Sequence, residues 1–103
     1  MRAVVGQTLA SVTDATTVIV IRAPRDDVDI TCGGVSMVDA KAGGPTELAS
    51  PDPAFAQGTQ LGKRYEDGAA AIELLCTKAG TSSLAVNGEP LLVKSAKPLP
   101  ASD

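Results

Sequence analysis

Histidine and tryptophan are absent from this chain of 103 residues, and phenylalanine and tyrosine occur once each. Without histidine the chain cannot form a Ser–His–Asp or Cys–His nucleophilic site, an HExxH zinc site or any imidazole ligand set. Neither Gly33-Gly34 nor Gly43-Gly44 has the flanking residues of a phosphate-binding loop. With so few aromatic rings, the core has to be built from valine, isoleucine, leucine and alanine.

A clustered charge of one sign is also lacking. Nine Lys and Arg against twelve Asp and Glu give a formal net charge of −3, and Lys63-Arg64 is the one adjacent basic pair. Since nucleic acids and anionic membranes require a concentrated positive field, we expect neither as a partner. No apolar run approaches the roughly 20 residues of a membrane span, and the N-terminus lacks the apolar centre of a signal peptide. We therefore expect a cytoplasmic protein with reduced cysteines.

The residues that are present indicate many short strands in one domain. Ten glycines and seven prolines favour turns over long helices. Val18–Ile21 is an unbroken β-branched run, typical of a buried strand, and residues 28–32 alternate apolar with polar side chains. Further strands are predicted at 72–76, 84–86 and 91–93, and Asn87-Gly88 predicts a tight turn. The predicted fold is all-β, a small barrel or sandwich, with an α+β fold as the alternative.

The two parts of the chain also resemble one another. A shift of 54 positions aligns them without a gap and places apolar residues on apolar residues and Gly34 on Gly88. Upstream, Gly6 and Gly62 occupy similar places if the first half carries two extra residues. The aligned apolar pairs are Val18 with Ile72, Val20 with Leu74, Ile21 with Leu75, Ile30 with Leu84, Cys32 with Val86, Met37 with Leu91 and Val38 with Leu92. We infer an internal duplication that forms a pseudo-two-fold domain of two related hairpin units.

The predicted organisation has repeat halves at about 1–40 and 61–93. A connector rich in proline and glycine spans 41–60, and an extended tail spans 94–103. In the α+β alternative, a short helix would lie in 7–14 or 53–60.

The order of motifs resembles desulforedoxin-like and rubredoxin-like knuckle domains. In the second half the resemblance rests on Gly62 with Tyr65, a hairpin, and the segment LAVNGEPL; in the first half it rests on ITCGGVSMV. Those families bind iron or zinc through four thiolates. The positions in this chain that match their metal-binding cysteines are Asp67, Ala70, Val86 and Asn87, with only Cys32 in the first half. A tetrathiolate site needs four sulfurs, so the resemblance implies the shape and not the metal.

The cysteines remain the first candidates for chemistry. Cys32 and Cys76 could be inert apolar residues, a disulfide, or ligands of zinc or iron. A reactive thiol at Cys32 is a further alternative, because the backbone of Gly33 and Gly34 could stabilise a thiolate.

Polar side chains provide the other candidates. Tyr65 and Arg64, next to Glu66-Asp67, form either a polar group in a cleft or an ordinary turn. Asp26, Asp27 and Asp29 fit turn chemistry, with a hard cation as the alternative. Glu73 is expected to face solvent. The candidate binding residues are therefore Cys32, Gly33, Gly34, Tyr65 and Arg64.

Two functions remain compatible with these observations. The first is a small, soluble, non-catalytic binding or accessory module that acts through a protein partner or self-association, without a cofactor. The alternative is a thiol-dependent or metal-dependent protein derived from a knuckle fold that uses Cys32 and Cys76. Since no catalytic groups are placed together in the sequence, we favour a protein that is not an enzyme.

Overall fold

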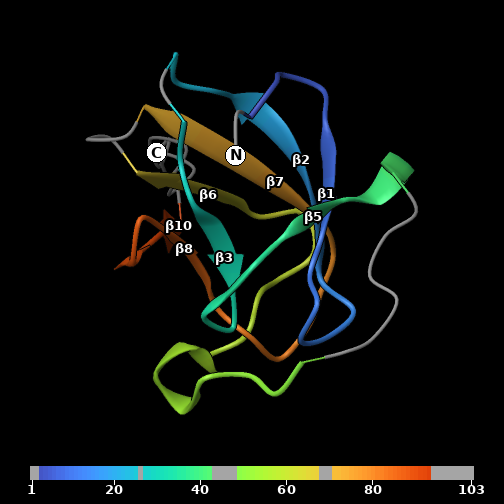
Figure 1. Cartoon of the computed structure of the whole chain (residues 1–103), viewed down its shortest axis with the longest axis vertical. Coiled ribbons are helices and arrows are strands. Elements are labelled where there is room, and N and C mark those ends of the chain that lie inside the picture. Colours follow the sequence, from blue (N-terminus) through green and yellow to red (C-terminus); the bar gives the residue numbers. More distant parts are fainter. Residues whose placement is uncertain (1–2, 26, 43–48, 68–70, 94–103) are drawn as a thin grey trace, which may run out of the picture.

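The computed structural model describes residues 3–25, 27–42, 49–67 and 71–93, which form two antiparallel sheets and two 3₁₀ turns (Figure 1). The larger sheet has the order β10-β6-β7-β2-β1-β5, and the smaller sheet has the order β4-β3-β8-β9. The elements are β1 (Thr8–Ala10), β2 (Thr17–Arg22), β3 (Ile30–Cys32), β4 (Val35–Ser36), β5 (Val38–Asp39), η1 (Ala40–Ala42), η2 (Pro53–Phe55), β6 (Arg64–Asp67), β7 (Ile72–Lys78), β8 (Leu84–Val86), β9 (Glu89–Pro90) and β10 (Leu92–Val93). The predicted tail at 94–103 and the connector residues 43–48 lie outside the described residues.

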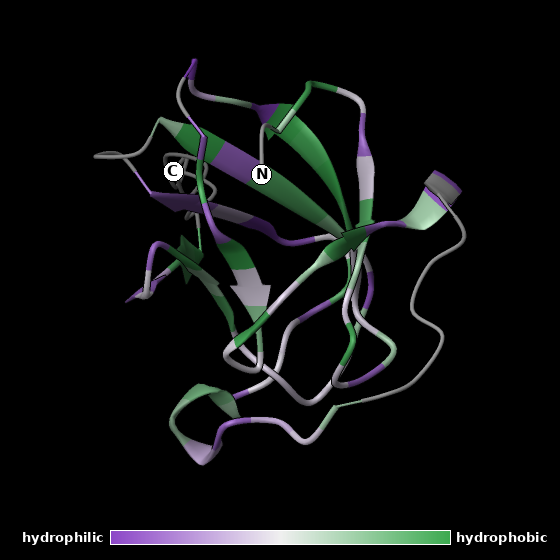
Figure 2. Ribbon diagram, in the orientation of Figure 1, coloured by the Kyte–Doolittle hydropathy of each residue, from purple (hydrophilic) through white to green (hydrophobic). Residues whose placement is uncertain are grey.

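The core lies between the two sheets, so the fold is a sandwich and the all-β prediction is confirmed. β2 and β7 are the central strands of the larger sheet, and their alternate side chains Val18, Val20 and Leu74 are fully buried. β3 and β8 supply the facing apolar layer from the smaller sheet, which includes Ile30 and Val86. Figure 2 shows the apolar colour concentrated on these central strands. The α+β alternative is wrong, because residues 8–10 form a strand and 53–55 form a single 3₁₀ turn.

A pseudo-two-fold axis relates the two halves of the sandwich. In the smaller sheet, Ile30 pairs with Val86 and Cys32 pairs with Leu84, so that Thr31 and Ala85 face each other on the axis. In the larger sheet, the axis passes between Ile19 and Leu75. The rotation exchanges the pair Val18–Cys76 with the pair Val20–Leu74, and the pair Thr17–Lys78 with the pair Arg22–Glu73. If each strand is replaced by its equivalent in the other half, the strand order of each sheet reads the same from either edge.

The structure corrects the gapless alignment by two residues in its first part. Gly6 N donates to Val20 O at 2.8 Å, and Gly62 N donates to Cys76 O at 2.9 Å, so Val20 corresponds to Cys76 rather than Leu74. The same offset of 56 positions relates β1 to β6 and β2 to β7, whereas β3, β4 and β5 correspond to β8, β9 and β10 at an offset of 54. The two extra residues of the first half lie between β2 and β3. Residues 23–29 form this connection, whereas the shorter segment 79–83 connects β7 to β8 in the second half.

Two tight turns at equivalent positions require unusual backbone angles. Gly33 and Gly34, which join β3 to β4, have φ of 67° and 81°, and Asn87 and Gly88, which join β8 to β9, have φ of 52° and 83°. Positive φ at both central residues matches the right-handed twist of the flanking strands, and glycine and asparagine adopt it at low cost. The tight turn expected from Asn87-Gly88 is therefore present.

The described part of the connector is bound to the end of the sandwich where the β3–β4 turn lies beside the loop that precedes β8. Asp52 N donates to Gly33 O at 2.7 Å, and Ser83 N donates to Phe55 O at 2.7 Å. The Asp52 side chain also caps η2, since its Oδ1 accepts from Ala54 N at 2.9 Å. In Figure 1 this segment runs below the strands as the yellow-green loop that carries η2. It brings residues 56–60 against 80–83.

Candidate functional site

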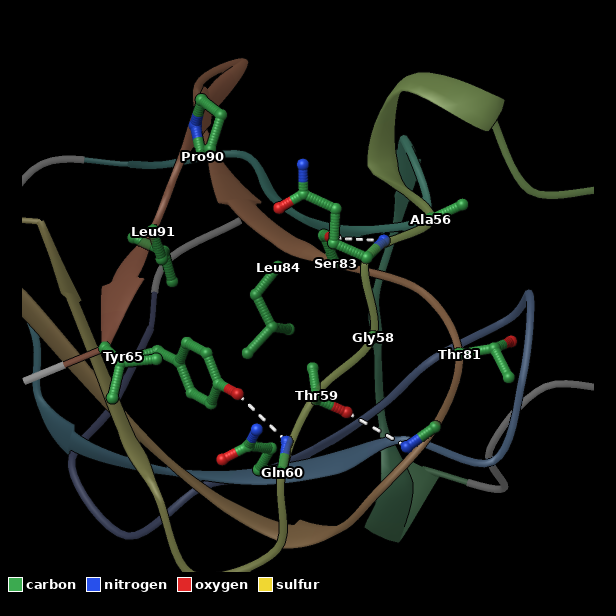
Figure 3. A pocket seen from close by; sticks show the side chains of 13 residues that line it. Ala56, Gly58, Thr59, Gln60, Tyr65, Thr81, Ser83, Leu84, Pro90 and Leu91 are labelled. Carbon is green, nitrogen blue, oxygen red and sulfur yellow. Dashed lines mark hydrogen bonds between the residues drawn. The ribbon is translucent and has the colours of Figure 1, made fainter.

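A cavity of about 600 Å³ lies where the connector meets the second half of the chain (Figure 3). Its volume falls within the range of about 300–1,000 Å³ that is usual for ligand sites. Among the described residues, every side chain that lines this connector cavity is uncharged. The thirteen lining residues are Ala56, Gln57, Gly58, Thr59, Gln60, Tyr65, Gly80, Thr81, Ser83, Leu84, Pro90, Leu91 and Val93.

Hydrogen bonds hold the connector wall of the cavity at a fixed distance from the rest of the domain. Gln60 N donates to the hydroxyl of Tyr65 at 2.9 Å, and Gln57 N donates to Ser83 Oγ at 2.8 Å. Between these two bonds, Thr59 N donates to Gly80 O at 3.0 Å, while Thr59 Oγ1 accepts from Gly80 N at 3.0 Å. Figure 3 shows three of these bonds, with the side chains of Tyr65 and Leu84 directed toward the middle of the cavity.

Two residues of the wall have backbone groups that are not paired within the described part of the chain. The backbone N–H and C=O groups of Gly58 and Thr81 form no hydrogen bond to any of the described residues. Polar backbone groups are strong donors and acceptors that water or a ligand has to satisfy. The apolar surface of the cavity comes mainly from the exposed residues Ala56, Pro90 and Val93, because Leu84 and Leu91 are buried in the core.

A carboxylate behind the cavity anchors the loop that carries Thr81 and Ser83. Asp14 Oδ2 accepts from Ser82 N at 2.8 Å, and Asp14 Oδ1 accepts from Thr16 N at 3.0 Å. Partial burial by itself raises the pKa of the Asp14 carboxyl, but the hydrogen bonds from Thr16 and Ser82 outweigh it and lower the pKa below its ordinary value. Asp14 is therefore ionised at neutral pH and binds the loop as a charged acceptor.

Hydroxyl groups extend this anchor. Thr13 Oγ1 donates to Cys32 O at 3.2 Å and lies 3.0 Å from Ser82 Oγ. Gly80 is packed so closely that a side chain there would overlap Thr16 Oγ1 and Asp14 Oδ2. The β1–β2 turn and the loop 80–83 therefore form one hydrogen-bonded unit that shapes the cavity from behind.

Both cysteines are buried and free, so the disulfide alternative is wrong. Burial raises the pKa of the Cys32 thiol, which disfavours the thiolate that a reactive cysteine needs. Cys32 Sγ lies 3.9 Å from Asp14 Oδ1, and Cys76 Sγ donates to Lys78 O at 3.3 Å. Across the described parts of the chain, no three side chains of His, Cys, Asp or Glu are grouped so that they could hold a metal ion.

The five candidate residues from the sequence do not form one site. Cys32, Gly33 and Gly34 lie at the β3–β4 turn, where Gly33 N donates to Ser83 O at 3.0 Å. Tyr65 lines the connector cavity, but Arg64 does not. Adjacent residues of a strand face opposite sides of a sheet. Tyr65 and Arg64 therefore cannot act together in one cleft.

Arg64 instead forms an ion pair with Glu73. The expectation that Glu73 faces solvent is wrong, because its side chain is only 5% exposed and its Oε2 lies 3.4 Å from Arg64 Nη1. Glu73 is on β7, where its cross-strand neighbours are Arg22 of β2 and Glu66 of β6. Since a buried carboxylate requires a partner, Arg64 has a structural role here.

In the acidic segment at 26–29, the hydrogen bonds of Asp29 run to other segments of the chain and not within a local turn. Asp29 Oδ1 accepts from Ser36 Oγ at 2.7 Å, and Asp29 N donates to Asn87 Oδ1 at 2.9 Å. Asp26 lies outside the described residues.

Sequence reasoning missed most of the cavity. Residues 56–60 have no regular hydrophobic period, and 80–83 read only as a turn. One difference between the halves indicated an apolar surface in the second half. In the alignment of the halves, the exposed Val93 of β10 corresponds to Asp39 of β5.

No protein-family model, curated protein or solved structure matches this chain. Within the described residues, no helix is both long enough and apolar enough to cross a membrane.

Proposed function

We propose that this protein is a non-catalytic binding module of the cytoplasm and that the connector cavity is its binding site. The observation that carries the proposal is a cavity of about 600 Å³ whose described lining is uncharged and partly apolar. Such a site favours a ligand without net charge, because its described lining offers no charged partner to an ionic ligand.

The chemistry of the lining supports a binding role rather than catalysis. General acid–base and nucleophilic catalysis require a titratable or activated group at the reacting atoms. The hydroxyls of Tyr65 and Ser83 accept hydrogen bonds from backbone amides of the connector, and no described base lies in the cavity to activate them. These hydroxyls hold the wall in place.

We also propose that the two halves arose by internal duplication and then diverged. The reciprocal strand pairing across the pseudo-two-fold axis supports a common origin. The halves differ in charge at the ends of the larger sheet, where Asp39 of β5 corresponds to Val93 of β10. In this view the second half carries the binding site, while the first half completes the core.

A thiol-dependent or metal-dependent protein of a knuckle fold is the alternative. The observation in its favour is the approach of Asp14 to the buried thiol of Cys32, at a distance of 3.9 Å between Oδ1 and Sγ. Elemental analysis of the purified protein distinguishes the two functions. Stoichiometric zinc or iron that is lost in a Cys32→Ser variant would support the alternative.

The binding proposal can be tested with the neutral fluorophore N-phenyl-1-naphthylamine, excited beyond the absorption of tryptophan. We expect saturable binding at one site. Val93→Trp, which places a large ring at the mouth of the cavity, should weaken binding at least tenfold. Val5→Trp is the matched control, because Val5 is exposed to a similar degree but does not line the cavity. Equal binding by both variants would contradict the proposal.

A further inference from the structure

A buried hydroxyl in the wall of the connector cavity has a proton without a described acceptor. Tyr65 is 6% exposed, and its hydroxyl oxygen accepts a hydrogen bond from Gln60 N at 2.9 Å. A phenol also donates one hydrogen bond, and no described residue accepts it. Figure 3 shows the tyrosine ring directed toward the middle of the cavity, with the hydroxyl at its tip. Since buried polar groups are nearly always hydrogen-bonded, water or a ligand has to accept this proton.

The lining carries further polar groups that are available to a ligand. Gln57, Gln60 and Thr81 are exposed, and their side chains form no hydrogen bond to the described residues. The hydroxyl of Ser83 accepts from Gln57 N, but its own proton has no described acceptor. A side-chain amide offers a carbonyl acceptor and two N–H donors, and a hydroxyl can both donate and accept. The cavity therefore presents uncharged donors and acceptors side by side.

Exposed apolar residues lie among these polar groups. Ala56 follows η2 in the connector, whereas Pro90 of β9 and Val93 of β10 belong to the second half of the chain. A ligand that contacts both kinds of surface has carbon–hydrogen faces and uncharged groups that donate and accept hydrogen bonds. The ring of a neutral saccharide has this arrangement, because its C–H groups form the faces and its hydroxyls surround the edge.

Other classes of small ligand fit this lining less well. A phosphorylated or carboxylated ligand would meet no cation, because Lys63 and Arg64 do not line the cavity. A nucleobase needs an exposed ring for stacking, and Tyr65, the one aromatic residue of the described lining, is almost fully buried. A purely apolar ligand would leave the hydroxyl of Tyr65 and the backbone groups of Gly58 and Thr81 without partners, which is unfavourable.

We propose that the ligand of the connector cavity is a neutral saccharide, held through its hydroxyl groups by Tyr65, Gln57 and Gln60. This inference rests on the proposed function and specifies its ligand. One saccharide hydroxyl accepts the proton of Tyr65, and others donate to a glutamine carbonyl and accept from its amide nitrogen. The C–H face of the ring packs against Pro90 and Val93. Because these hydrogen bonds replace bonds to water, we expect a dissociation constant of about 1 mM.

The test titrates the full chain with four neutral disaccharides: maltose, cellobiose, lactose and N,N′-diacetylchitobiose. N-phenyl-1-naphthylamine reports occupancy of the cavity, and ¹H–¹⁵N nuclear magnetic resonance spectra locate the bound saccharide. We expect at least one disaccharide to displace the fluorophore competitively and to shift the amides of Gly58, Tyr65 and Thr81. Removal of single hydroxyls from that disaccharide should weaken binding about three- to tenfold at the positions that contact the protein.

The protein side of the interaction is tested with the double variant Gln57→Leu and Gln60→Leu, which removes both amides and changes the size of the side chains little. We expect its affinity for the disaccharide to fall at least tenfold. Gln7→Leu is the matched control, because Gln7 is the remaining glutamine of the chain and does not line the cavity; its affinity should stay within about twofold. Thermal unfolding of both variants monitors the fold. The deoxygenated saccharides test the same claim without altering the protein.

Each other result would overturn the inference. Failure of all four disaccharides, with N-phenyl-1-naphthylamine still bound in the cavity, would leave the proposed function standing and remove the saccharide. Equal affinity of the double variant and Gln7→Leu for the disaccharide would show that the cavity amides do not hold it. Tighter binding of glucose 6-phosphate than of glucose would identify an anionic ligand. If neither the fluorophore nor a saccharide binds, both proposals fail.

Discussion

Replacing Asp14 by Asn should destabilise the protein at neutral pH and have little effect in acid. The carboxylate accepts hydrogen bonds from two backbone amides, Thr16 N at 3.0 Å and Ser82 N at 2.8 Å. An Asn side chain has one acceptor oxygen, so its amide nitrogen would face one of these donors. Hydrogen bonds to a charged group contribute about 1.5–3 kcal/mol each. Because Asp14 is only partly buried, we expect a total loss of about 1–3 kcal/mol in the free energy of unfolding.

The pH dependence follows from the lowered pKa of Asp14. A carboxyl whose folded-state pKa lies below its unfolded value stabilises the fold above the unfolded pKa, and this contribution is lost as the pH falls through the folded pKa. The difference between Asp14→Asn and the natural chain should therefore be full at pH 7 and decline below about pH 4, near the ordinary carboxyl pKa.

Urea unfolding, followed by circular dichroism at pH 7 and at about pH 3, measures both effects. Asp27→Asn is the matched control, because Asp27 is exposed and forms no hydrogen bond to a described residue. A destabilisation by Asp14→Asn below about 0.5 kcal/mol at pH 7, or one that is the same at both pH values, would refute the role assigned to this carboxylate.

Three further predictions concern the packing around the site. Gly80→Ala should destabilise the fold by about 1–3 kcal/mol in urea unfolding, since the added carbon overlaps atoms behind the loop; an unchanged midpoint would contradict this. Leu74→Ala should cost about 2–5 kcal/mol because Leu74 is fully buried, whereas Leu92→Ala at the exposed edge should change stability by less than about 0.5 kcal/mol; equal effects would argue against the described core. Cys32 and Cys76 should both react slowly with Ellman's reagent in the folded protein and release two equivalents of thiol in denaturant; rapid reaction of either in the folded state would contradict their burial.

Much of the architecture could be predicted because it depends on local pattern. The β-branched run at Val18–Ile21 became the central strand β2, and Asn87-Gly88 became a tight turn between β8 and β9. The exact correspondence of the halves could not be predicted in the same way. Side chains alternate with a period of two, so an error of two residues still places apolar residues on apolar residues. The match of Gly6 with Gly62 indicates the two extra residues, and the backbone hydrogen bonds of these glycines show that the strands β2 and β7 share that offset.

The candidate site was less predictable, because its residues come together only through long-range contacts. Glu73 reads as a solvent-facing position in an alternating strand, yet its side chain is buried and pairs with Arg64. The hydroxyl of Tyr65 accepts a hydrogen bond from Gln60 N in the connector, but the sequence does not indicate which loop packs against the tyrosine ring. Loops without periodicity carry little information about where they pack.

The most direct test of the central claim is a two-dimensional ¹H–¹⁵N nuclear magnetic resonance titration of the full chain with N-phenyl-1-naphthylamine. The account predicts shifts at the amides of Gly58, Tyr65 and Thr81, which line the cavity. The amide of Leu9, the two-fold equivalent of Tyr65, is an internal reference and should not move. Shifts of equal size at Leu9 and Tyr65, or shifts confined to residues outside the cavity, would contradict the assignment of the connector cavity as the binding site.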